Sequence, residues 1–334
     1  EVLSKVTEKQ IEETKEYMNH ASLRVIPSES GLIFDICIRV YSGSDSAAAR
    51  IVDYHTNVVM VKKNEDYLIN REITGRTESS MADQSLLTVK DICEFAETVD
   101  IDDVREVLDR QISYNMAIAQ EGMKHSYGAN IGKVLLDIYG DSDVKIRAKA
   151  MAAAGSDARM NGCELPVVIC SGSGNQGMTA SVPVIIYAQE LGSTQEDLYR
   201  ALVVSNLSTL HIKQGIGRLS AYCGAVGAGC GAGAGIAWLH GGRYEEIAHT
   251  LVNGLAIISG TICDGAKASC AAKIASSVDA GILGYFMYKE GQQFRGGDGI
   301  VKKGVENTIR SVGILASEGM QETDREIVRI MIGE

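Results

Sequence analysis

The chain has few of the residues that a β-sandwich or a nucleic-acid-binding protein needs. Aromatic side chains make up only 5% of its 334 residues and three residues are proline, whereas 36 are glycine. A core built mainly from aliphatic, alanine and glycine residues favours closely packed helices over a β-sandwich. Lysine and arginine number 32 against 43 aspartates and glutamates, which gives a net charge of -11. Affinity for nucleic acid depends on basic side chains at phosphates, so we expect no nucleic-acid partner.

The chain also lacks the apolar core of a signal peptide. Residues 1–20 have the pattern of a charged, amphipathic helix, so we expect a cytoplasmic protein. Residues 219–240, LSAYCGAVGAGCGAGAGIAWLH, contain no lysine, arginine, aspartate or glutamate and are long enough to span a membrane. Because weakly hydrophobic glycine and alanine dominate this segment, we interpret it as a buried central helix and expect no membrane partner.

The sequence changes from strand-like segments to helical periodicity near residue 76. Residues 1–75 contain short segments rich in β-branched and aromatic residues, which predict strands, and SDSAAARIVDY at 44–54, which we interpret as a short crossing helix. We expect a small α/β domain that is incomplete, because a few strands and one helix can hardly close a sheet layer. Residues 76–334 show helix-length apolar periodicity, beginning with SLLTVKDICEFAETV at 85–99. The predicted fold class is therefore α+β, with a mainly α-helical domain over 76–334.

The eight cysteines are the first candidates for chemistry, because without an export signal they are more typical of thiols or metal ligands than of a disulfide framework. Cys263 and Cys270 lie in ICDGAKASC, and Cys223 precedes them by forty residues or more. Three thiolates from two separated segments can hold three irons of a [4Fe-4S] cluster and leave one iron open as a Lewis acid. The alternative is that these cysteines are small core residues, although the aspartate, lysine and serine between them are unusual for an apolar core.

A second candidate site is the segment SGSGNQG at 171–177, which precedes the helix pattern MTASVPVIIYAQEL. A glycine- and serine-rich loop that opens a helix leaves backbone N–H groups free. Together with the helix dipole, these groups can bind a carboxylate or a phosphate. The alternative is a tight turn between two helices. The candidate substrate-binding residues are Ser171, Ser173, Asn175 and Gln176.

Polar residues outside these segments carry a weaker signal. His55, in DYHTN at 53–57, lies between strand-like segments, where it and Asn57 face either a cleft or solvent. Asn115 and Arg159 lie in helix-like segments, where a buried polar group needs a partner from the protein or from a ligand.

Taken together, several segments resemble those of the L-cysteine desulfidase family, which is also described as serine dehydratase alpha-chain-like and is related to bacterial iron–sulfur L-serine dehydratases. They are SDARM at 156–160, SGSGNQG at 171–177, GRLSAYC at 217–223, ICDGAKASC at 262–270 and MQETDREI at 320–327, and the resemblance covers essentially the whole chain. It implies an oxygen-sensitive [4Fe-4S] cluster, independent of pyridoxal phosphate, with ligands that match Cys223, Cys263 and Cys270. Ligand status is not carried over to Cys230 or to the other four cysteines.

The resemblance further implies β-elimination on a small L-amino acid. L-cysteine would yield pyruvate, ammonia and sulfide, and L-serine would yield pyruvate and ammonia. Both substrates need the same carboxylate clamp and the same open iron, so the sequence does not distinguish them. The substrate carboxylate is expected in the SGSGNQG loop, with His55 and Asn57 as candidate catalytic residues that orient the substrate.

One departure from the family concerns a Gly-Cys-Thr-Glu-Pro motif near the start of its members, which this chain does not contain. The cysteine of that motif is thought to serve the substrate site, so we expect the 334-residue chain to bind a cluster but to show little activity. We also expect the incomplete domain at 1–75 to pair with a second copy, as a homodimer, or to be completed by a missing N-terminal segment.

Two alternative functions remain open. A pyridoxal-phosphate-dependent β-eliminase would hold the phosphate in the SGSGNQG loop and form its Schiff base at Lys213 or Lys267. The other alternative is a regulatory or structural subunit without a cluster, which the missing N-terminal motif favours.

Overall fold

The computed structural model describes residues 6–28, 30–32, 34–53, 56–73, 86–217 and 219–333. The chain divides into unit 1, which comprises Glu1–Asp83 and Val328–Glu334, and unit 2, which comprises Gln84–Ile327. The boundary expected between residues 75 and 76 lies outside the described residues. Helices dominate the described part of the chain and accompany a small antiparallel sheet, so the predicted α+β class is confirmed.

Unit 1 contains a helix and a four-stranded sheet. Helix α1 (Glu8–His20) begins after Thr7, whose side chain forms a reciprocal capping box with the side chain of Gln10. The strands are β1 (Asp35–Ser42), β2 (Asp45–Val52), β3 (Val58–Lys63) and β4 (Asp66–Asn70), and they pair antiparallel in that order. Among the residues described, β1 is an edge strand that leaves apolar side chains such as Ile38 exposed.

The crossing helix interpreted at 44–54 is wrong, because Asp45–Val52 is strand β2. Three consecutive alanines at 47–49 favour a helix in isolation. In the sheet, however, β2 is a central strand that pairs with β1 along its full length and with β3 on its other side. An ion pair of 2.7 Å between Arg50 and Asp35 adds a contact between β1 and β2. Pairing with two neighbours therefore outweighs local propensity.

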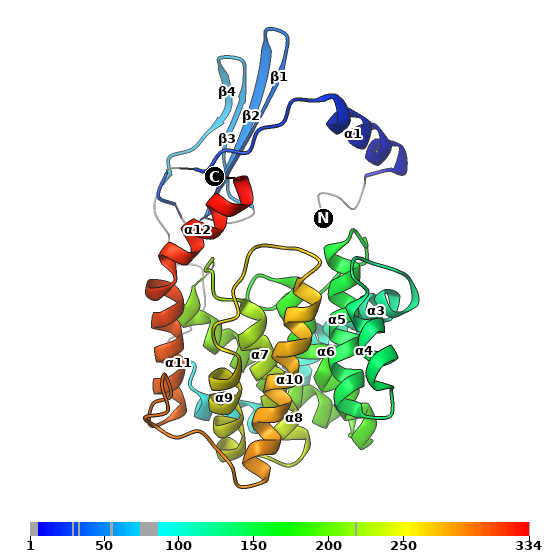
Figure 1. Cartoon of the computed structure of the whole chain (residues 1–334), viewed down its shortest axis with the longest axis vertical. Helices are drawn as coiled ribbons and strands as arrows, with labels where there is room; N and C mark the ends of the chain where they lie inside the picture. The colour runs from blue at the N-terminus through cyan, green and yellow to red at the C-terminus, as the bar shows by residue number, and fades with distance from the viewer. Residues whose placement is uncertain are drawn as a thin grey trace. The chain divides into compact units, whose positions relative to one another are not determined.

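Unit 2 is a bundle of helices (Figure 1). In chain order they are α2 (Val89–Thr98), α3 (Ile101–Lys124), α4 (Ile131–Tyr139), α5 (Val144–Met160), α6 (Gly174–Leu191), α7 (Gln195–Ile216), α8 (Gly224–Leu239), α9 (Tyr244–Ile258), α10 (Cys270–Lys289), α11 (Val305–Ile314), the π-helix η3 (Leu315–Gly319) and α12 (Gln321–Ile332). The last residues of α12 belong to unit 1. The helix predicted at 85–99 is confirmed as α2.

Helix α8 is the centre of this bundle. Its residues from Ala225 to Trp238 are all buried, and α6, α7, α9 and α10 pack around it. The buried central helix expected within 219–240 is therefore confirmed. Over the ranges that the structure describes, no helix combines the length and the apolar character needed to cross a membrane.

Glycines let α8 and α10 approach each other closely. A Cβ atom on Gly281 of α10 would lie 2.0 Å from the carbonyl oxygen of Gly229 in α8. A Cβ atom on Gly233 would likewise lie 2.4 Å from the carbonyl oxygen of Gly281. No side chain fits at these positions, so the two backbones are in direct contact. This contact determines the separation of two helices whose N-terminal ends carry Cys223 and Cys270.

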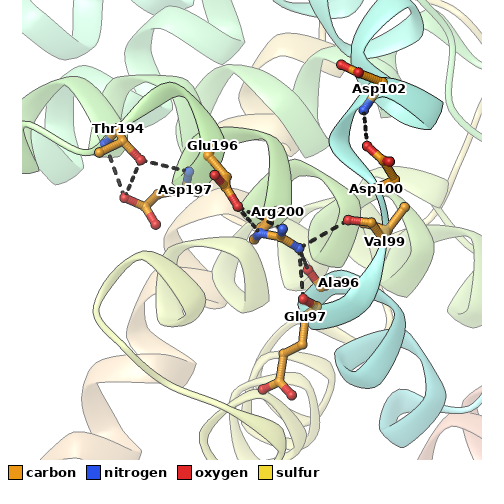
Figure 2. Close-up of polar contacts among 9 residues, drawn as sticks. All are labelled: Ala96, Glu97, Val99, Asp100, Asp102, Thr194, Glu196, Asp197 and Arg200. Carbon is orange, nitrogen blue, oxygen red and sulfur yellow. Dashed lines mark hydrogen bonds and ion pairs between the residues drawn. The ribbon is translucent and has the colours of Figure 1, made fainter.

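Arg200 on α7 caps the C-terminal end of α2 (Figure 2). Its guanidinium donates hydrogen bonds to the carbonyl oxygens of Ala96 and Glu97, at 2.6 and 3.0 Å, and forms an ion pair of 2.7 Å with Glu196. Helix α7 itself begins with a capping box at Thr194. Hydrogen bonds to a charged group are worth roughly 1.5–3 kcal/mol each. Arg200 is therefore a structural arginine that joins α2 to α7.

Candidate functional site

Two of the three candidate cluster ligands lie on neighbouring backbone segments. The backbone N–H of Cys223 donates to the carbonyl oxygen of Thr261 at 3.1 Å. The backbone N–H of Cys263 donates to the carbonyl oxygen of Ala221 at 2.6 Å. These reciprocal hydrogen bonds pair the two segments antiparallel, although forty residues separate the two cysteines.

Tyr222 and Ile262, which lie between these two hydrogen bonds, form the antiparallel bridge itself. Successive side chains of an extended strand point to opposite faces, so Cys223 and Cys263 share the face opposite Tyr222. They are diagonal neighbours, whose Cα atoms in a regular sheet are about 7–8 Å apart. That separation is too large for a disulfide, and both cysteines are free. It suits thiolates that bind different irons of one cluster.

Three helices present their N-terminal ends to this region. Cys223 is the N-cap residue of α8, and Cys270 is the first residue of α10. Gln176, in the first turn of α6, packs against Gly224, because a Cβ atom on that glycine would lie 2.6 Å from the Gln176 side-chain nitrogen. The N-terminal end of a helix carries a partial positive charge, which stabilises thiolates and carboxylates.

Backbone N–H groups at these helix ends reach the cysteine sulfurs. The N–H of Lys267 donates to Sγ of Cys270 at 3.5 Å. Burial raises the pKa of the Cys223 thiol, the N–H of Ala225 lowers it, and the charges of Cys263 and Cys270 raise it further. The pKa of Cys223 is raised overall, because burial and the negative charges of the neighbouring thiolates disfavour its own deprotonated form. A bound metal cation would offset both effects, since it binds the deprotonated thiol.

The possible metal donors of this region suit a cluster better than a single metal ion. Within the residues described, no three histidine, cysteine, aspartate or glutamate side chains are grouped tightly enough to hold one ion. A [4Fe-4S] cluster takes one thiolate per iron, so its ligands are spread more widely. Cys263 and Cys270 are both near enough to Cys223 to affect its pKa, and Cys223 and Cys270 lie at helix N-terminal ends, so these three residues fit a cluster better than a single ion.

Lysine side chains lie beside the three thiols. Lys273, one turn into α10, forms an ion pair with Asp264, and its charge lowers the pKa of Cys223. Burial lowers the pKa of Lys273, but the hydrogen bond and charge of Asp264, together with the charges of Cys223 and Cys270, raise it above its usual value. Lys213, in the last turn of α7, is half-buried, and burial lowers its pKa while the charges of Cys263 and Cys223 raise it. The region therefore favours anions.

Arg159, near the C-terminal end of α5, adds a half-buried positive charge beside α6. Its guanidinium donates to Oδ1 of Asn175 at 3.3 Å, and a Cβ atom on Gly174 would lie 2.5 Å from its Nε. Burial lowers the pKa of this guanidinium, and the charge of Cys270 raises it. Among the described residues, no aspartate or glutamate forms an ion pair with Arg159. A carboxylate ligand would supply the missing negative charge.

Residues 170–173 form a closed turn at the start of α6. Cys170 and Ser173 exchange two backbone hydrogen bonds of 3.1 Å each. Ser173 then caps the helix, since its Oγ accepts a hydrogen bond of 3.5 Å from the N–H of Gln176. The helix therefore begins at Gly174, earlier than the sequence pattern predicted, because the GNQG part of SGSGNQG lies in its first turn.

Two polar atoms of this segment are buried without a hydrogen-bond partner in the described part of the chain. They are Oγ of Ser171 and Oε1 of Gln176, and Gln176 is only 7% exposed. Ser171 also has a left-handed backbone, with φ at 51°. Buried polar atoms are nearly always hydrogen-bonded, and unusual backbone conformations gather at functional sites. The segment therefore fits a polar ligand that supplies the missing partners.

The remaining polar candidates lie elsewhere. His55 is outside the described residues. Asn57, in unit 1, donates from Nδ2 to the carbonyl oxygen of Val52 at 3.0 Å and closes the turn between β2 and β3. The catalytic role of these two residues stays a prediction. Asn115 is structural, because its side chain exchanges hydrogen bonds of 3.2 and 2.8 Å with the backbone of Val168.

Sequence reasoning missed the lysines that lie beside the thiols. Lys273 had a usable signal, since it follows Cys270 by three residues and a helix places such residues on one face. Lys213 was considered only as a Schiff-base lysine. Its position beside Cys223 and Cys263 depends on how α7 packs against α8, which no local pattern reports.

A mainly helical chain that gathers thiols and basic side chains near helix N-terminal ends offers a site suited to an anionic ligand. A family model described as Serine dehydratase alpha chain matches residues 1–329. The chain therefore belongs to the serine dehydratase alpha chain family, and the family expected from the sequence is confirmed. The description of this family supports an enzyme of the lyase type that acts in amino-acid catabolism.

Similar proteins align with nearly the whole of this chain. A UPF0597 protein of Desulfitobacterium hafniense is 60% identical over 334 residues, which are 100% of this chain and 77% of that protein. UPF0597 proteins of Lachnoclostridium phytofermentans and Treponema denticola are 51% and 42% identical. Both alignments cover 99% of this chain, and they cover 79% and 78% of those two proteins. These names state no activity and no substrate.

Proposed function

We propose that this chain carries out β-elimination on L-cysteine or L-serine with a [4Fe-4S] cluster bound by Cys223, Cys263 and Cys270. L-cysteine would yield pyruvate, ammonia and sulfide, and L-serine would yield pyruvate and ammonia. The observation that carries the proposal is the reciprocal hydrogen bonding between the Cys223 and Cys263 segments, at the N-terminal end of α8. Membership of the serine dehydratase alpha chain family supports it.

When bound, the cluster supplies an open iron that acts as a Lewis acid toward the β-substituent of the substrate. The protein itself contributes positive charge that stabilises the thiolate ligands. Thiolates in a buried site are costly without nearby cations, and Lys213 and Lys273 supply positive charge beside them. The N-terminal ends of α8 and α10 add their partial positive charges at the sulfurs.

The substrate carboxylate would bind at the N-terminal end of α6. Ser173 and Asn175 lie at this end, and Arg159 supplies the positive charge beside them. A carboxylate held here fixes the orientation of the α-carbon relative to the thiols of α8 and α10. A base then removes the α-proton as the β-substituent leaves, and the resulting aminoacrylate hydrolyses to pyruvate and ammonia. His55 and Asn57 are proposed to orient the substrate for this step.

Metal analysis and product release test the proposal together. Protein purified without air should contain about four irons and four acid-labile sulfides per chain. Release of pyruvate is then measured with L-cysteine and with L-serine, for this chain and for the chain extended by the Gly-Cys-Thr-Glu-Pro segment of its family. Bound pyridoxal phosphate in place of iron would favour the pyridoxal-phosphate eliminase. Protein with neither cofactor and no pyruvate release would favour the clusterless subunit.

The Arg159→Ala chain should have a KM for L-cysteine raised roughly 10–100-fold, with a smaller change in kcat, because a hydrogen bond to a charged group is worth roughly 1.5–3 kcal/mol. Arg159→Lys keeps the positive charge but loses the planar guanidinium that can form two hydrogen bonds to a carboxylate. Its KM should therefore lie between those of the wild-type and Arg159→Ala chains. Steady-state kinetics on whichever protein releases pyruvate give both constants. Arg110→Ala is the control, since Arg110 is a half-exposed arginine of α3 that forms an ion pair with the exposed Glu106. An unchanged KM in a folded Arg159→Ala chain would exclude this carboxylate site.

A further inference from the structure

We propose that Tyr222 and Ser259 are positioning residues that hold the Cys223 and Cys263 segments in register before any cluster binds. The importance of this register rests on the proposed function, because that function makes both cysteines cluster ligands. The contacts that carry the inference lie within the polypeptide itself and can be measured without the cluster.

The side chain of Tyr222 is fully enclosed, at 1% exposure, and makes a directed hydrogen bond. Its hydroxyl lies 3.0 Å from Oγ of Ser259, which in turn donates to the carbonyl oxygen of Leu255 at 2.5 Å. A serine hydroxyl has a single hydrogen, and here Leu255 receives it. The phenol of Tyr222 is therefore the donor to Ser259, which ends helix α9 as its C-cap residue.

This hydrogen bond anchors the segment 259–263 at its beginning, whereas the bridge beside Cys263 anchors it at its end. Gly260 lies between the two anchors with φ at 108°, a conformation that residues with side chains rarely adopt. Without the first anchor, the segment that leads to Cys263 would be held only by the bridge and by local hydrogen bonds to the end of α9, such as those from Thr261 to the carbonyl oxygen of Ile258.

Tyr222 is also held on its own segment. Its backbone N–H donates to Oγ of Ser220 at 3.0 Å, and that hydroxyl donates to the carbonyl oxygen of Ala316 in the π-helix η3 at 2.8 Å. The segment 220–222 is therefore hydrogen-bonded to η3, and the Tyr222 hydroxyl links it to Ser259 at the end of α9. Because the ring and the two thiols lie on opposite faces of the bridge, Tyr222 acts on the cysteines through the backbone and does not contact the substrate face.

Amide hydrogen exchange of the cluster-free protein tests the proposal. The Tyr222→Phe chain should exchange the amides of Cys223 and Cys263 about fivefold faster than the wild-type chain, which corresponds to about 1 kcal/mol at 1.36 kcal/mol per tenfold. Tyr199→Phe is the matched control, because Tyr199 is equally buried and loses a hydroxyl bond to Asp109 at the other end of α7. Its chain should exchange these two amides at the wild-type rate.

Two further measurements complete the test. Ser259→Ala should speed exchange at least as much as Tyr222→Phe, because it removes the same bond together with the bond of Ser259 to Leu255. The double variant should exchange no faster than Ser259→Ala alone. In iron-loaded protein, a chelator should bleach the cluster of the Tyr222→Phe chain about fivefold faster than that of Tyr199→Phe, again about 1 kcal/mol. Exchange in the Tyr222→Phe chain no faster than in Tyr199→Phe would overturn the positioning role. If no variant and not even the wild-type chain binds iron, the proposed function is wrong. The positioning role would then still be decided by the amide exchange rates, which are measured without the cluster.

Discussion

The Cys263→Ser chain should be isolated with little or no iron, and the same substitution in whichever protein releases pyruvate, this chain or the extended one, should lower that release by more than about 100-fold. Loss of a group that merely supports a metal ligand typically costs about 10–100-fold in metal affinity or activity, and loss of the ligand itself costs more. A serine hydroxyl keeps the volume of the side chain but does not ionise near neutral pH, so it replaces a thiolate poorly. Cys223→Ser and Cys270→Ser should behave in the same way. Iron and sulfide per chain, with pyruvate release, are the measurements.

Cys230→Ala provides the matched control for this series. Cys230 is fully buried in α8, two turns beyond Cys223, and packs against Gly254. Its removal leaves a small cavity that should cost about 1 kcal/mol of stability, but the chain should keep its iron. Iron retained by Cys263→Ser and lost by Cys230→Ala would assign the cluster to a different set of cysteines.

The Gly281→Ala chain should lose about 3 kcal/mol of its free energy of unfolding, the upper part of the usual range for overpacking a core. The added Cβ would lie 2.0 Å from the carbonyl oxygen of Gly229 and 3.3 Å from the backbone nitrogen of Gly233, and neither backbone atom can move without its helix. Thermal unfolding should show a midpoint lowered by roughly 6–12 °C, given roughly 2–4 °C per kcal/mol for a domain of this size. Iron content should fall as well, because the N-terminal ends of α8 and α10 would be pushed apart.

Gly319→Ala is the control for the glycine substitution. A Cβ atom on Gly319 would meet only Cδ1 of Leu315, at 3.2 Å, and the end of a leucine side chain can move aside. Its midpoint should stay close to that of the wild-type chain. Equal stability of both variants would show that α8 and α10 can separate at little cost, contrary to the close backbone packing described above.

The parts of the fold that could be predicted from the sequence are those with a local cause. Apolar residues such as Ile92 and Ala96 recur at helical spacing and identify α2. The serine that caps α6 precedes a glutamine by three residues, a pattern typical of helix starts. The alanines at 47–49 misled the interpretation, because the pairing of β2 with two neighbours has no signal inside the strand itself.

The candidate site could be predicted only in part, for a related reason. The motifs with Cys223, Cys263 and Cys270 were recognisable as residues, but the bridge that joins the first two spans too few residues to show any periodicity. The positions of Arg159 and Lys213 depend on the packing of α5 and α7, so their contacts appear only once the helices are assembled.

The backbone contact between α8 and α10 bears on how this family can diverge. Where glycine meets glycine, as at Gly229 and Gly281, there is no side chain to lengthen or shorten, so we expect the distance between the two helix starts to vary little among relatives. We then expect new substrate preferences to arise in the connecting segments, above all 170–173 and 264–269, because these lie outside the contact between the two helices. An attempt to redesign selectivity should therefore randomise those two segments and leave the glycines of α8 and α10 untouched.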